Sequence, residues 1–88
     1  MYGLITEFKI SKEDCYLNIY IKCEKCSVMV IALDGIVDED IDICGLQLAN
    51  LACSEKSEAG LTLELQLQKV VPYVVCGRDV KVLVNNME

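Results

Sequence analysis

Two cysteines separated by two residues, Cys23 and Cys26, form the most motif-like pattern in this chain. Two thiolates at this spacing on a hairpin tip can bind one zinc ion in the manner of a zinc knuckle. A closed site needs two further ligands, and because the chain has no histidine, the candidates are Cys76 with either Cys15 or Cys44. The pattern therefore predicts a structural zinc module as one alternative. The others are six reduced thiols that pack as small hydrophobes, and a disulfide or redox pair.

A second pattern is a run of carboxylates without any basic residue between positions 34 and 42, formed by Asp34, Asp38, Glu39, Asp40 and Asp42. The spacing of the last three aspartates repeats the start of a calcium loop, but the glycine and the final glutamate of such a loop are missing. Acidic residues also favour the N-terminus of a helix, where the helix dipole stabilises negative charge. A third interpretation is that these carboxylates bind a basic surface on a partner protein.

Two tyrosines lie on the polar face of one predicted strand, where Tyr16 and Tyr20 alternate with Asn18 and Lys22. Exposed tyrosines beside polar residues are typical of protein contact surfaces, because they combine large contact area with a hydrogen-bonding tip. Cross-strand packing within the sheet is the alternative explanation. We therefore include both tyrosines among the candidate partner-binding residues.

Composition argues against several classes of function. With 14 acidic and 8 basic residues the net charge is −6, which disfavours direct binding to nucleic acid. Without histidine or a glycine-rich phosphate loop, catalysis has little support, and we expect no enzymatic activity and no cofactor beyond the zinc alternative. No apolar run approaches the roughly 20 residues that span a bilayer, and the N-terminal residues do not resemble a signal peptide. We expect a cytoplasmic protein that does not bind membranes.

Hydrophobic periodicity predicts the elements that position these residues. Strict alternation predicts half-exposed strands over residues 15–23 and 61–67, and a strand over residues 2–10 with its core side on the even positions. Runs that are apolar on both faces predict strands over residues 26–33, 70–76 and 80–84, the last two joined by a hairpin at residues 77–79. Apolar spacings of three and four predict a helix over residues 40–57.

These elements predict one α+β domain over residues 1–88, with a mainly antiparallel sheet of five or six strands and one helix packed on one face, in the order β-β-β-α-β-β-β. One helix covers only part of such a sheet. The strands that are apolar on both faces therefore need another cover, which could be a second copy of the chain or a partner. The structural alternative is a half-barrel that closes on itself.

The leading functional hypothesis is a small acidic module without enzymatic activity that occupies a surface on another protein, as an inhibitor or adaptor, and self-associates. Small acidic proteins of this type are common among phages and other mobile elements, although no residue pattern here ties the chain to them.

Overall fold

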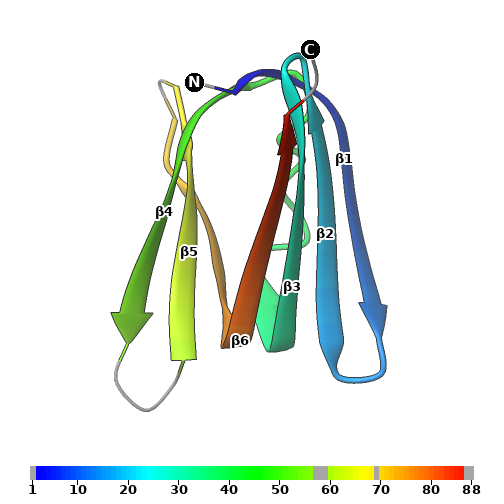
Figure 1. Cartoon of the computed structure of the whole chain (residues 1–88), viewed down its shortest axis with the longest axis vertical. Coiled ribbons are helices and arrows are strands. Elements are labelled where there is room, and N and C mark those ends of the chain that lie inside the picture. Colours follow the sequence, from blue (N-terminus) through cyan, green and yellow to red (C-terminus); the bar gives the residue numbers. More distant parts are fainter. Residues whose placement is uncertain (1, 57–59, 69, 87–88) are drawn as a thin grey trace.

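The six strands that the structure describes form one antiparallel sheet that closes into a barrel (Figure 1). The computed structural model describes residues 2–56, 60–68 and 70–86. The strands are β1 (Gly3–Glu13), β2 (Tyr16–Cys23), β3 (Cys26–Val37), β4 (Gln47–Lys56), β5 (Gly60–Leu67) and β6 (Tyr73–Asn86). Around the barrel their order is β1-β2-β3-β6-β5-β4. Because the described residues contain no helix, the prediction of an α+β fold is wrong and the fold class is all-β.

Closure of the barrel depends on a short contact between β1 and β4. Gly3 lies opposite Leu48 and Leu4 lies opposite Gln47, and these are the two residue pairs of this junction. The amide of Ile5 extends the contact by donating to the carbonyl of Leu46 at 2.9 Å. The sheet thus closes on itself, which was the alternative architecture predicted above.

Alternate residues of the strands fill the interior of the barrel. The predicted strands over residues 15–23 and 61–67 are observed as β2 and β5, and their inward residues include Leu17, Ile19, Leu63 and Leu65. Burying a large aliphatic side chain contributes about 1.5–3 kcal/mol. The buried apolar side chains are Ile5, Leu17, Ile19, Ile21, Cys23, Cys26, Val28, Val30, Ala32, Ile43, Leu48, Leu63, Leu65, Leu67, Tyr73 and Val75.

The helix predicted over residues 40–57 is replaced by a loop over residues 38–46 followed by β4. A β-bulge explains the error, because the register of β4 against β5 shifts between Leu48 and Asn50. The extra residue brings Leu48 and Leu51 to the inner side at a spacing of three, which imitates a helical repeat. Gly45 interrupts the segment further, since its φ of +90° lies outside the helical region.

β3 and β6 bend together at the lower end of the barrel in Figure 1. Their register shifts on both sides of the pair Leu33 and Arg78, with an extra residue first in β6 and then in β3. Asp34 and Asp79 have positive φ values of 51° and 47° at these two bulges. Residues 77–79 are therefore a bend inside one 14-residue strand, and the predicted hairpin between two separate strands is wrong.

Glycine is required where the two bent strands approach each other. A Cβ added to Gly77 would lie 2.9 Å from the Cβ of Ala32, and one added to Gly35 would lie 2.6 Å from the Cβ of Leu17. Such distances are far below carbon–carbon contact distance. The bend therefore requires glycine at positions 35 and 77 as well as the two bulges.

β1 also contains a bulge, between Ile5 and Glu7. Ile5 is fully buried, whereas after the bulge the inward positions are Phe8 and Ile10, which pack against the core. The prediction that even positions face the core therefore holds only for the second half of the strand. The ring of Phe8 packs edge-on against Tyr73 with centroids 5.5 Å apart.

Candidate protein-binding surface

The outward residues of β2, β3 and β6 form an apolar patch, in which Asn18 and Lys81 flank Ile31. The strand register places Tyr20 opposite Met29, and Met29 opposite Leu83, so these three side chains form one row across the sheet. The next positions along β3 add Ile31 and Leu33, and Leu33 lies opposite Tyr16. We call this patch the outer apolar face, composed of Tyr16, Tyr20, Met29, Ile31, Leu33 and Leu83.

Several members of the outer apolar face are well exposed. Tyr16 is 46%, Met29 39% and Leu83 59% exposed. Single exposed apolar residues are normal on a protein surface, but a contiguous apolar patch with a polar border marks an interaction site. The predicted tyrosines are therefore part of a larger apolar surface, on the side of the sheet opposite the buried core.

Three lysines border or interrupt the outer apolar face. Lys9 lies opposite Tyr20, Lys81 lies opposite Ile31, and Lys22 lies in the row next to Tyr20 along β2. The border also carries Glu13, which lies opposite Tyr16, and Glu7, which lies opposite Lys22, so its charge is mixed. A complementary surface would be apolar, with carboxylates where it faces Lys9 and Lys81.

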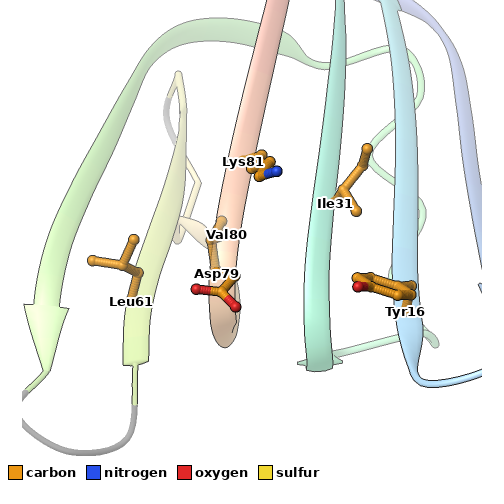
Figure 2. A pocket seen from close by; sticks show the side chains of 6 residues that line it. All are labelled: Tyr16, Ile31, Leu61, Asp79, Val80 and Lys81. Carbon is orange, nitrogen blue, oxygen red and sulfur yellow. The ribbon is translucent and has the colours of Figure 1, made fainter.

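A cavity of about 550 Å³ adjoins the lower part of the outer apolar face (Figure 2). Tyr16 and Ile31 line one side, Asp79, Val80 and Lys81 of β6 lie in the middle, and Leu61 of β5 lies on the other side. Ligand pockets in proteins commonly have volumes of about 300–1,000 Å³. The cavity is thus large enough to receive side chains of a bound partner.

The structure separates the acidic segment from the tyrosines. Residues 39–42 line a smaller cavity with Phe8 and Ile10, on the core side of β1, whereas Tyr16 and Tyr20 point outward from β2. The loop is anchored by Ile43, which is fully buried in the core. Residues 39–42 therefore do not share one surface with the tyrosines, whereas Asp34 lines a cavity of about 210 Å³ together with Tyr16.

Most of the predicted acidic residues have local contacts. The carboxylate of Asp38 accepts a hydrogen bond from the amide of Asp40 at 3.1 Å, and that of Asp42 accepts one from the amide of Cys44 at 2.9 Å. Glu39 lies 3.7 Å from the ammonium of Lys12. These contacts stabilise the loop conformation.

Asp34 lies apart from the loop, at the bend of β3, where it forms an ion pair with Arg78. Hydrogen bonding and charge attraction from Asp34 raise the pKa of the Arg78 guanidinium. Both side chains are exposed, so the pair adds little stability. Binding of a basic partner by Asp34 and the acidic loop stays a prediction.

The cysteines of the predicted zinc site divide into two groups. Cys23 and Cys26 are buried on the inner side of the β2–β3 hairpin, and burial together with Cys26 raises the pKa of the Cys23 thiol to about 12. Cys76 lies near the bend, with its sulfur 3.8 Å from the hydroxyl of Thr62. Within residues 2–56, 60–68 and 70–86, no three cysteine or carboxylate side chains are grouped to hold a metal. The zinc module stays a prediction.

Sequence reasoning missed Met29, Leu83 and Lys81 as surface residues. All three residues belong to the apolar runs CSVMVIAL and VKVLV, which predicted strands that are apolar on both faces. The runs do not say which residues face outward or that the two strands are neighbours. That β3 pairs with β6, and so joins their outward residues into one face, is visible only in the folded sheet.

Comparison with known proteins offers no relative from which a function could be transferred. No family model, no curated protein and no solved structure matches this chain. In the part of the chain that the structure describes, no helix is long and apolar enough to cross a membrane. The functional argument therefore starts from the outer apolar face itself.

Proposed function

We propose that this chain is a protein-binding module without enzymatic activity, which acts as an inhibitor or adaptor by occupying a surface on a partner protein. The row of Tyr20, Met29 and Leu83 on the outer apolar face is the observation that carries the proposal. Burial of these side chains by a partner supplies the free energy of binding, on the order of 1.5–3 kcal/mol for each aliphatic side chain.

The partner chemistry follows from the residues around the row. The proposed partner presents an apolar patch that covers Met29 and Leu83, with carboxylates that face Lys9 and Lys81. Self-association through the same face is a second way to cover it and stays a prediction. We further propose that the module acts in the cytoplasm, where thiols such as Cys23 and Cys26 stay reduced.

Affinity capture with matched variants tests this function. The chain is immobilised, incubated with lysate of its native host, and compared with Met29→Glu and with Ile36→Glu. Ile36 is a suitable control because it is 72% exposed but lies beyond the bend of β3, outside the outer apolar face. Circular dichroism checks that both variants are folded.

We expect wild type and Ile36→Glu to retain the same partner in equal amounts, and Met29→Glu to lose at least about 90% of it, since a tenfold change in affinity corresponds to about 1.4 kcal/mol. Equal retention by Met29→Glu and wild type would show that the outer apolar face is not the binding surface.

A further inference from the structure

One edge of β6 has no neighbouring strand along most of its length. β3 pairs with β6 from Val75 to Asn86, whereas β5 pairs with it only from Tyr73 to Gly77. On the side away from β3, no described strand pairs with residues 80–86. We call this side of residues 80–86 the open edge. Unpaired backbone N–H and C=O groups on a strand edge are a template for an additional strand.

The open edge carries one charged residue, Lys81, and is otherwise apolar from Val80 to Val84. Val84 is 42% exposed although it lies opposite Val28, which is fully buried on the core side. Leu83 is exposed on the outer side, so the edge presents apolar groups on both faces. β1 differs, because its segment from Glu7 to Glu13 pairs with β2 alone and carries four charged residues, Glu7, Lys9, Lys12 and Glu13. Charged side chains of this kind protect an edge from pairing.

Space for side chains exists beside the open edge. The 550 Å³ cavity spans β6 at Asp79, Val80 and Lys81, with Leu61 of β5 on the side of the open edge and Ile31 and Tyr16 on the opposite side (Figure 2). A single added strand along β6 could direct its side chains into this cavity. Two copies of the chain would each bring a net charge of −6, which disfavours their association through this edge.

The residues of the open edge define the chemistry of the added strand. Val80, Val82 and Val84 alternate with Lys81 and Leu83 along β6. Lys81 is exposed and forms no ion pair with the described residues. We infer that the open edge binds an extended peptide segment of a partner protein by strand addition, with apolar residues at alternate positions on the core side and a carboxylate beside Lys81.

This inference goes beyond the proposed function, because it rests on backbone pairing along β6 and not on the outer apolar face. A capped synthetic peptide, Ac-Thr-Val-Glu-Val-Glu-Val-Thr-NH2, is a suitable probe. Its binding to the ¹⁵N-labelled chain is measured by NMR, together with amide hydrogen exchange over residues 80–86. Two further peptides test the backbone hydrogen bonds. One is N-methylated at the valines and the other at the threonines and glutamates, so each lacks the N–H donors on one edge of the peptide but keeps all side chains.

We expect alternate amides of residues 80–86 to exchange rapidly in the free chain and to become protected when the probe binds. N-methylation of one alternate set should abolish binding, whereas the other set should be tolerated. Lys81→Glu should weaken binding of the probe by about two- to five-fold, the range of an exposed ion pair, and a probe with lysine in place of glutamate should reverse this loss. Lys9→Glu, on a distant strand, should leave the affinity unchanged.

Three results would overturn the inference. The first is slow exchange of all amides of residues 80–86 in the free monomer, which would show that the edge is already covered. The second is the absence of spectral change at these residues with millimolar probe. The third is protection of the same amides in a dimer without any peptide, which would identify a second copy as the occupant. The N-methylated peptides test backbone pairing along β6, whereas the capture experiment with Met29→Glu uses no peptide, so the failure of this inference and that of the proposed function are distinguishable.

Discussion

Gly77→Ala is the substitution that tests the bend of β3 and β6 most sharply. The new methyl group would lie 2.9 Å from the Cβ of Ala32 and 3.2 Å from both the Cα of Gly35 and the carbonyl oxygen of Leu33. Favourable carbon–carbon contacts lie at about 3.5–4.0 Å, and two of these three neighbours are backbone atoms that cannot rotate away. Overpacking of this kind costs about 1–3 kcal/mol, so we expect the free energy of unfolding to fall by that amount.

A double-mutant cycle separates the clash from other effects of the substitution. Ala32→Gly removes the nearest atom, and although it destabilises the chain alone, it should make Gly77→Ala less costly by about 1–2 kcal/mol. Gly45→Ala is the control, because no atom lies within 4 Å of its added Cβ and its cost arises from the φ of +90°. Ala32→Gly should not rescue that control.

Urea unfolding followed by far-UV circular dichroism measures the free energy of unfolding of wild type and of each variant in the cycle and its control. The proposed geometry of the bend would be refuted if Gly77→Ala changed the free energy of unfolding by less than about 0.5 kcal/mol, the range of neutral surface substitutions. Additivity of Gly77→Ala and Ala32→Gly would refute it as well, because residues in contact should couple.

Three further predictions concern titration, a buried hydroxyl and an exposed ion pair. Burial raises the pKa of Cys23 from 9.0 to about 12 and that of Tyr73 from 10.0 to about 12. Above pH 9 the unfolded chain therefore loses these protons before the folded chain does, and the free energy of unfolding should fall as the pH rises. The urea midpoint should fall less steeply above pH 9 in Cys23→Ala, and an identical slope would contradict this. Tyr73→Phe removes the 2.5 Å hydrogen bond that the tyrosine hydroxyl donates to the carbonyl of Asp38. Urea unfolding should show that the free energy of unfolding falls by about 0.5–1.5 kcal/mol, and an unchanged value would exclude a stabilising role for that bond. Arg78→Gln should leave the melting temperature unchanged, since its pair with Asp34 is exposed, and a large decrease would contradict the weak pair.

The sequence was sufficient to predict strands wherever alternation was uninterrupted. β2 and β5 alternate without a bulge, and their inward residues Leu17, Ile19, Leu63 and Leu65 are buried as the pattern predicts. Errors arose where one extra residue changes the phase of the pattern. The bulge after Leu48 produced the spacing that was interpreted as a helix.

Turn-like residues inside strands caused the second kind of error. Asp34-Gly35 and Gly77-Arg78-Asp79 have the composition of turns, which ended two predicted strands too early. In the folded chain these two segments lie on neighbouring strands and bend them together, so neither ends its strand. Such a paired bend depends on contacts between residues distant in sequence, which periodicity does not contain.

The candidate site was predicted in part for the same reason. The polar side of β2 identified Tyr16 and Tyr20 as outward residues, and both lie on the outer apolar face. The pairing of β3 with β6, which adds Met29 and Leu83, could not be derived from either strand alone. The composition of the acidic segment also could not predict that Asp38 and Asp42 accept hydrogen bonds from nearby backbone amides.

Site-specific photocrosslinking in the native host tests the central claim most directly. A photoreactive amino acid is introduced in place of Met29 on the outer apolar face or, in a separate variant, in place of Asp40 in the acidic loop. We predict a discrete covalent adduct with one partner protein from position 29 and none from position 40. An adduct that forms only from position 40, or equally from both positions, would contradict the assignment of the outer apolar face as the binding surface.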